Sequence, residues 1–266
     1  MVIGNVIARL DQETQSAGVS IRIGFMASLP HPEGEQHRFR NRTQAGLFLA
    51  SRLQQYADRS DVLVVALPRG GVPVGYEVAK ALHVPLDILI VRKLGTPGQE
   101  ELAMGAIASG GFQVVNQEIV RMLGISESEI RSIEARELRE LERREQIYRA
   151  GRVPHEIRGK TVILVDDGVA TGTTVRVAIA ALRAQGPSSI VAAFPVAAPS
   201  TCEELRSEVD ELVCLLTPQS LYAIGFWYED FDATSDDTVC DLLKRAEENI
   251  APTTSLSRYQ PPTEKV

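Results

Sequence analysis

The residues best suited to chemistry lie in one segment of the sequence, Val162–Thr174, which is VILVDDGVATGTT. An apolar run delivers two adjacent carboxylates, Asp166 and Asp167, and a loop of small and hydroxyl-bearing residues follows. Backbone N–H groups in such a loop, and in a helix that begins after it, can converge on one phosphate. Gly172 would let the backbone approach closely. The hydroxyl donors are Thr171, Thr173 and Thr174. Because the carboxylates could accept hydrogen bonds from two vicinal hydroxyls, the segment predicts binding of a ribose 5-phosphate group.

A simpler explanation of the acidic pair is structural. Asp166 and Asp167 would then be a polar strand end, with Asp167 capping the next element. Capping explains one aspartate, but it explains neither the second one nor the loop of small and threonine residues. The sequence contains no GxxxxGK(S/T) loop of nucleoside triphosphatases and no GxGxxG dinucleotide fingerprint.

Two further candidate motifs also follow apolar runs. Pro68-Arg69-Gly70-Gly71 comes directly after the apolar run Val62–Leu67, and Arg92-Lys93 ends a second predicted strand, Leu86–Val91. Runs that are apolar on both faces suit the interior of a parallel sheet, and such sheets bind ligands beyond the carboxyl ends of their strands. We therefore expect the three motifs to meet at one sheet edge. The plainer alternatives are a strand-to-helix turn for the first motif and a solvated basic pair for the second.

Strands alternate with helices along the chain, which predicts an α/β fold with a doubly wound, mainly parallel sheet. Further strands are predicted at Thr161–Val165, Ile190–Phe194 and Glu211–Leu216. Helices are predicted at Thr43–Tyr56, Val72–Leu82, Ser126–Arg149, Thr173–Ala184, Cys202–Val209 and Asp236–Glu248. A hairpin is predicted around Gly110-Gly111.

The helix predicted over Ser126–Arg149 is long and highly charged. Ser126 and Glu129 have the spacing of a capping box. Three acid–base pairs have the favourable i,i+4 order: Glu127–Arg131, Glu140–Arg144 and Glu145–Arg149. The dense charge favours a solvated face, and a surface for a partner helix is the alternative.

Composition limits the kinds of partner. The 266 residues carry a net charge of −7, which argues against a nucleic acid or a membrane surface as the main partner. No apolar run is long enough for a membrane span. The three cysteines lack metal-ligand spacing and are typical of reduced thiols, and the start lacks the layout of an export signal. We therefore expect a cytoplasmic protein.

The chain is expected to have three parts. Residues 1–37 are predicted to be a disordered N-terminal arm, residues 38–249 a single domain, and residues 250–266 a loose, proline-rich tail. The sequence leaves open whether the chain forms a homo-oligomer.

VILVDDGVATGTT resembles the phosphoribosyl pyrophosphate signature of the type I phosphoribosyltransferases, and the likeness extends from about Phe39 to about Leu243. The motifs FRxR…AG, PRGGVPVG and VRKLG resemble a group of bacterial predicted phosphoribosyltransferases. By this resemblance Asp166 and Asp167 bind the ribose hydroxyls, and the loop Ala170–Thr174 holds the 5-phosphate.

The resemblance also assigns the pyrophosphate site. Pro68–Gly71 corresponds to the pyrophosphate loop of the family, with Arg69, Gly70 and Gly71 at the ligand and a cis peptide expected at Arg69–Gly70. Arg92 and Lys93 correspond to a basic pair near the pyrophosphate, and Mg²⁺ is expected to arrive with the substrate. Leu94–Gly111 corresponds to a mobile catalytic loop that closes over the substrate.

The acceptor pocket of the family, its hood, corresponds to Leu221–Phe231. Tyr222 matches an aromatic residue that stacks on a purine, and Glu229 matches a carboxylate that contacts the metal, although ordinary packing of the aromatic residues would look the same. The resemblance thus implies a type I fold with a small hood and a long helical insertion.

Two departures from the 6-oxopurine enzymes concern the acceptor. Ala170 stands where those enzymes carry a carboxylate that can accept a proton from the base. No lysine lies between Pro187 and Tyr222, where they use one to recognise the exocyclic oxygen. Hypoxanthine and guanine are therefore disfavoured, and the likeness of Ala170 and Arg92-Lys93 to adenine enzymes is slight.

The expected activity is Mg²⁺-dependent transfer of a 5-phosphoribosyl group from phosphoribosyl pyrophosphate to a nitrogenous base. Catalysis would rest on Asp166, Asp167, Arg69 and Lys93. Two alternatives remain: a regulatory module that senses phosphoribosyl pyrophosphate or a nucleotide, and a hydrolase that acts on a phosphorylated ribose.

Overall fold

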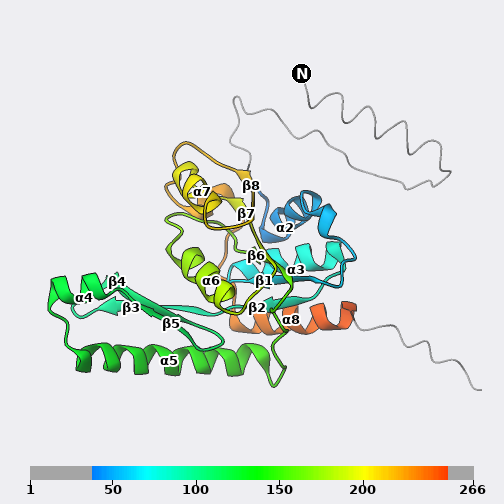
Figure 1. Cartoon of the computed structure of the whole chain (residues 1–266). Helices are drawn as coiled ribbons and strands as arrows, with labels where there is room; N and C mark the ends of the chain where they lie inside the picture. Colours follow the sequence, from blue (N-terminus) through cyan, green and yellow to red (C-terminus); the bar gives the residue numbers. More distant parts are fainter. Residues whose placement is uncertain (1–37, 251–266) are drawn as a thin grey trace, which may run out of the picture. The chain divides into compact units, whose positions relative to one another are not determined.

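The computed structural model describes residues 38–250 (Figure 1). The predictions for the arm over residues 1–37 and for the tail after Ile250 lie outside the described residues. No helix within residues 38–250 is long and apolar enough to cross a membrane.

The centre of the fold is a five-stranded sheet in the order β2-β1-β6-β7-β8. Its strands are β1 (Val62–Ala66), β2 (Leu86–Ile88), β6 (Thr161–Val165), β7 (Ser189–Val196) and β8 (Glu211–Leu216). All neighbouring pairs are parallel, and β1 pairs with β6 from Val62↔Thr161 to Ala66↔Val165. The predicted α/β fold with a parallel sheet is confirmed.

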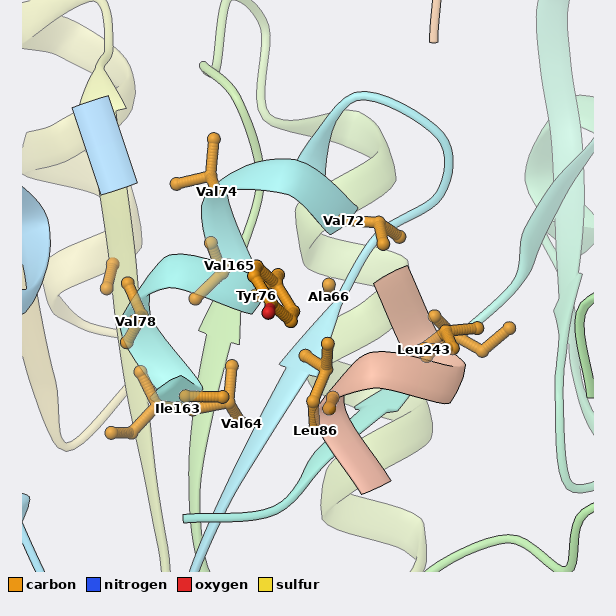
Figure 2. Close-up of a cluster of buried hydrophobic side chains, with 14 of the residues drawn as sticks. Val64, Ala66, Val72, Val74, Tyr76, Val78, Leu86, Ile163, Val165 and Leu243 are labelled. Atoms are coloured by element: carbon orange, nitrogen blue, oxygen red, sulfur yellow. The ribbon is translucent and has the colours of Figure 1, made fainter. Parts of the chain in front are cut away.

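Helices cover both faces of this sheet, which is why most residues of its strands are apolar. Val64, Ala66 and Ile163 face a core shared with α2 (Arg42–Ser51), α3 (Gly71–Leu82) and α8 (Asp236–Ile250). Residues of the opposite parity, such as Val65 and Leu164, face α6 (Thr173–Ala184) and α7 (Pro199–Arg206). Figure 2 shows the first core, where side chains of α3 and Leu243 of α8 gather against β1, β2 and β6.

A second, antiparallel sheet lies in the insertion between β2 and β6 (Figure 1). It has the order β3-β4-β5, with β3 at Val91–Thr96, β4 at Gln99–Ala108 and β5 at Phe112–Val115. The turn at Gly110-Gly111 joins β4 to β5, as predicted. Helices α4 (Gln117–Leu123) and α5 (Glu127–Arg149) follow, and α4 was not predicted.

The strand predicted over Leu86–Val91 is wrong at its end. The parallel strand β2 stops at Ile88, Leu89 donates to the Ala66 carbonyl at 3.1 Å, and Ile90 donates to the Ser109 hydroxyl at 3.1 Å. The chain therefore passes from one sheet to the other between Ile88 and Val91. Because Leu86–Ile90 is buried on the way, the apolar run shows no break in the sequence.

Helix α5 has the predicted capping box, in which the side chains of Ser126 and Glu129 cap each other's backbone N–H groups. Two of the three predicted i,i+4 pairs are present, including Glu127–Arg131 at 3.0 Å. The third prediction is wrong, because Arg149 instead binds Asp87 at 2.7 Å and the Ile88 carbonyl at 3.1 Å. The buried carboxylate of Asp87 needs a charged partner, and Arg149 supplies one.

Other boundaries shift by a few residues. Helix α2 ends at Ser51, and a short 3₁₀ turn, η1 (Gln54–Tyr56), completes the segment that was predicted as one helix. Helix α7 begins at Pro199, before the predicted Cys202, since proline is suited to the first helical turn.

Candidate active site

Two of the three predicted motifs lie at the ends of β1 and β6, which are direct neighbours. Arg92-Lys93 lies inside β3 of the second sheet, so the expectation that all three motifs follow strands of one parallel sheet is wrong for this pair. Leu67 donates its N–H to the Val165 carbonyl at 2.9 Å, so the turn Pro68–Gly71 runs beside Asp166 and Asp167. A Cβ atom on Gly71 would lie 2.9 Å from the Asp166 Cα. The predicted meeting of the acidic pair with the glycine turn is therefore present in the fold.

The glycine turn contains a non-proline cis peptide, but one residue earlier than expected. The cis bond is Pro68–Arg69, and the prediction of Arg69–Gly70 is wrong. Gly70 already has helical dihedral angles as the N-cap of α3, and Val72 donates to the Arg69 carbonyl at 3.2 Å. Gly70 is therefore the N-cap residue, and α3 begins at Gly71, directly after the turn.

Gly70 is required by the closeness of Asp167. A Cβ atom added to Gly70 would lie 2.0 Å from Asp167 Oδ2, far inside contact distance. The turn and the second carboxylate therefore pack directly against each other, and no larger residue fits between them.

The two carboxylates have different surroundings. Asp166 is half-buried, and its Oδ1 accepts the Asp167 N–H at 2.9 Å. Asp167 is 9% exposed. Burial, and then the neighbouring Asp167 charge, raises the pKa of Asp166 well above its ordinary value. Burial also raises the pKa of Asp167, although Arg42 opposes this shift.

Arg42 is a site residue that the sequence analysis did not assign. Its Nε and Nη2 atoms each lie 2.8 Å from Asp167 Oδ2, and Nη1 donates to the Asp232 carbonyl at 2.8 Å. Arg42 is the last residue of the FRxR motif, so the signal was present in the sequence. Spacing alone could not pair Arg42 with an aspartate 125 residues away.

The predicted phosphate loop has the expected form. Gly172 is left-handed, with φ of +74°, and as the N-cap of α6 it offers no side-chain acceptor to the first N–H groups of this helix. Those N–H groups are therefore suited to an anion. Four of the five loop residues are exposed: Ala170, Thr171, Thr173 and Thr174.

Side chains from behind the loop hold its carbonyl groups. Thr201 of α7 donates to the Ala170 carbonyl at 2.5 Å, and Arg176 of α6 donates to the Thr171 carbonyl at 3.2 Å. Arg176 is in turn paired with Glu204 and Glu208. These supporting residues were not predicted, because each lies on a helix face that the sequence pattern does not distinguish from ordinary surface.

The three basic residues predicted at the pyrophosphate have different surroundings. Arg69 is half-exposed, and its Nη1 lies 3.6 Å from Asp236 Oδ1. Arg92 Nε and Nη2 bind Glu137 Oε2 of α5 at 2.9 and 2.5 Å, which directs this guanidinium toward α5. Lys93 is exposed on β3, on the opposite face from Arg92 because side chains alternate along a strand.

The hood is built from two distant segments. A β-bridge joins Phe39 to Tyr228, and a 3₁₀ turn, η2 (Ile224–Trp227), precedes Tyr228. Ile224 packs so closely over Gly168 that a Cβ on this glycine would lie 2.6 Å from its Cγ2. Tyr222 is 88% exposed and Glu229 is also exposed.

Tyr228 is the aromatic residue of the hood that contacts the acidic pair. It is buried, and its hydroxyl donates to the Asp167 carbonyl at 2.6 Å. Burial raises the pKa of the Tyr228 phenol, so it remains a neutral donor. The resemblance had pointed to Tyr222 in this segment and not to Tyr228.

The chain is similar in sequence to known proteins. Residues 37–226 match the phosphoribosyl transferase domain family. Two curated proteins from two strains of Mycobacterium tuberculosis are each 43% identical to this chain over 213 residues. Both carry the name phosphoribosyl transferase. The match covers 80% of this chain and 48% of theirs, so the chain spans about half the length of the curated relatives it matches.

A solved structure is also similar. The crystal structure of a Thermus thermophilus protein is 38% identical with a TM-score of 0.69, and the match covers 78% of this chain and 98% of that one. The residues that form the parallel sheet, the glycine turn, the acidic pair and the threonine loop all lie within the range that matches the domain family. The chain belongs to the phosphoribosyltransferase family.

Proposed function

We propose that the chain transfers a 5-phosphoribosyl group from phosphoribosyl pyrophosphate to a nitrogenous base and releases pyrophosphate. The observation that carries this proposal is the meeting of three parts at one sheet edge. Asp166 and Asp167, the threonine loop before α6 and the turn Pro68–Gly71 offer hydroxyl acceptors, a phosphate cradle and a second anion loop.

Each part of the substrate has a proposed binding region. The 5-phosphate would bind the N–H groups and hydroxyls of Ala170, Thr171, Gly172, Thr173 and Thr174. The ribose hydroxyls would donate to the acidic pair, mainly to Asp166, which is the more exposed of the two residues. The pyrophosphate would bind the turn that contains Arg69, Gly70 and Gly71.

The reaction would break the bond between ribose C1 and the pyrophosphate oxygen and form a bond from C1 to a base nitrogen. The base nitrogen gives its proton to the departing pyrophosphate or to water, and pyrophosphate leaves with the electron pair of the broken bond. Positive charge develops on the ribose ring, so a carboxylate fixed at its hydroxyls is already oriented for the transition state. Arg69 and Lys93 would offset the negative charge of the leaving group.

Mg²⁺ is proposed as the cation that accompanies pyrophosphate. The donor set fits this cation, because half-buried Asp166 offers a hard carboxylate oxygen beside the anion loop. When bound, Mg²⁺ would neutralise pyrophosphate oxygens. Arg92 is also proposed at the pyrophosphate, although its contact with Glu137 would have to loosen first.

The acceptor would bind under the hood. The ring of Tyr222 is exposed and could stack on a base, and the exposed carboxylate of Glu229 could contact the metal, as the family resemblance implies. Stacking on an aromatic face is favourable for any base. The hood therefore leaves the identity of the base to experiment.

A sensing module is the second candidate. The specific observation in its favour is Ala170, an exposed residue where the 6-oxopurine enzymes of the family carry a carboxylate that can accept a proton from the base. Such a module would bind phosphoribosyl pyrophosphate but release little pyrophosphate.

One experiment separates these functions. The full chain is incubated with Mg²⁺, phosphoribosyl pyrophosphate and each common base in turn, and pyrophosphate release is followed. Release that depends on one base supports the transferase, and release without a base indicates a hydrolase. Binding without release across the panel supports the sensor, and no binding at all contradicts the proposed site.

The Arg69→Ala variant tests the role of the glycine turn. It should lower turnover strongly while the unfolding transition stays close to that of the unchanged chain, because Arg69 is half-exposed and its ion pair with Asp236 is long. Unchanged turnover would contradict the placement of pyrophosphate at this turn.

A further inference from the structure

The guanidinium group of Arg42 is held by more contacts than that of an ordinary surface arginine. All three guanidinium nitrogens have an acceptor at 2.8 Å, two at Asp167 Oδ2 and one at the Asp232 carbonyl. The side chains of Arg42 and Asp167 are 12% and 13% exposed. The ion pair is therefore largely desolvated, and its geometry is set by three directed contacts.

The same guanidinium is stacked on the hood. Its central carbon lies 3.8 Å from the centroid of the Phe231 ring and 6.0 Å from that of Tyr228. The two rings lie 4.9 Å apart. A planar cation between a carboxylate and aromatic rings is a role for arginine that lysine cannot reproduce.

Backbone contacts bring these groups together. Phe39 donates to the Trp227 carbonyl at 2.8 Å and accepts from the Glu229 N–H at 2.8 Å. The segment that leads into α2 and the hood segment are thus paired, and Arg42 at the start of α2 and Tyr228 of the hood contact the same aspartate. Arg42 binds the carboxylate of Asp167, while the Tyr228 hydroxyl binds its carbonyl.

We propose that Arg42 is a positioning residue that fixes the acceptor hood relative to the ribose site. Asp167 serves as the anchor of this contact, and Asp166 is the carboxylate that receives the ribose hydroxyls. The angle and distance at which the acceptor nitrogen meets ribose C1 are then set by Arg42, and with them the choice of acceptor. The effect of Arg42 on the acceptor rests on the proposed function, whereas its contacts with Asp167 and the hood do not.

The geometry can be tested without any substrate, because the chain has a single tryptophan and it lies in the hood at Trp227. In Arg42→Gln, the emission of Trp227 should shift to the red and acrylamide should quench it more strongly than in the unchanged chain. Arg42→Lys should restore the signal only in part, because it keeps the charge but loses the planar fork.

Arg59→Gln is the matched control. Arg59 also binds an aspartate, Asp61, through two nitrogens at 3.1 and 2.7 Å, and it lies 5.5 Å from the Tyr56 ring. It precedes β1 and so lies at the opposite end of this strand from the acidic pair. The Trp227 emission of Arg59→Gln should equal that of the unchanged chain. Phe231→Leu, which removes the stacking and keeps the ion pair, provides a second variant should Arg42→Gln not fold.

The consequence is tested with the base that the panel identifies. Arg42→Gln should raise the KM for the base by roughly tenfold, which is the scale of one lost charge-assisted contact. The KM for phosphoribosyl pyrophosphate should stay within about threefold of its value in the unchanged chain, a change worth well under the energy of such a contact. An equal change in both KM values, or unaltered Trp227 emission, would overturn the inference. If the unchanged chain shows no turnover with any base, the proposed function fails, and the tryptophan measurement still decides the positioning role.

Discussion

Two neighbouring aspartates at the end of β6 differ in the contacts that hold them. Asp167 is held by Arg42 and by Tyr228, while the side chain of Asp166 accepts the Asp167 N–H. A carboxylate with little protein stabilisation is costly to keep charged, and it is available to a ligand. Active sites commonly keep such groups at a cost in stability.

The first prediction at this scale is that Asp166→Asn stabilises the fold. The folded-state pKa of Asp166 is raised, so the folded chain holds this proton to higher pH than the unfolded chain does. The contribution of Asp166 to stability is thus undiminished below its ordinary pKa of about 3.9 and falls as pH rises toward the raised value.

The comparison is made by urea unfolding of the unchanged chain and of Asp166→Asn from mildly acid to mildly alkaline pH. The stability advantage of the variant should grow with rising pH, because asparagine keeps the hydrogen bond from the Asp167 N–H but carries no charge. A variant that is less stable at every pH would contradict the raised pKa.

A second prediction concerns Gly70. In Gly70→Ala the new methyl group meets Asp167 Oδ2 at 2.0 Å, and overpacking of this kind costs about 1–3 kcal/mol of unfolding free energy. The clash should be specific to the carboxylate. In the Asp167→Ala background the same Gly70→Ala change should therefore cost much less, and equal costs in both backgrounds would show that Asp167 is not the obstacle.

At the scale of elements, one ion pair joins two parts of the insertion between β2 and β6, and another joins the insertion to the parallel sheet. Arg92 of β3 binds Glu137 of α5, and Arg149 of α5 binds Asp87 of β2. Both arginines were predicted to have other roles. In each case the deciding partner lies on an element that is distant in sequence, so only the fold reveals it.

Removing one partner of the Arg92–Glu137 pair should release β3 from α5. Glu137 is 7% exposed, and loss of a partner in a buried pair lowers the free energy of unfolding by about 3–5 kcal/mol. Because Arg92 is partly exposed, the expected loss in Glu137→Gln is about 1–3 kcal/mol. The measurement is the free energy of urea unfolding. Glu127→Gln breaks an exposed pair on the same helix and should cost less than about 0.5 kcal/mol; similar costs for both variants would contradict this account.

For the whole molecule, the sequence was sufficient for the parallel sheet and for the signature. The strands β1, β6 and β8 and helix α6 were located closely because each combines a clear apolar run with turn or cap residues at its ends. The acidic pair, the threonine loop and the glycine turn could be placed at one edge because parallel strands end on the same side.

Other features could not be obtained from the sequence. The change of sheet at Leu89-Ile90 is hidden because buried residues continue through it. Arg42 and Tyr228 belong to segments at opposite ends of the domain, and only their common contact with Asp167 makes them part of the site. Local patterns record the face of an element, but they do not record which distant residue lies against it.

The central claim is that the edge beside Asp166 binds the activated pentose. Calorimetric titration of the full chain with phosphoribosyl pyrophosphate and Mg²⁺ tests it directly. The account predicts saturable binding that ribose 5-phosphate competes away and that Asp166→Asn weakens roughly 10- to 100-fold, the loss expected for hydrogen bonds to a charged group. Absence of binding, or equal affinity in the folded Asp166→Asn variant, would contradict it.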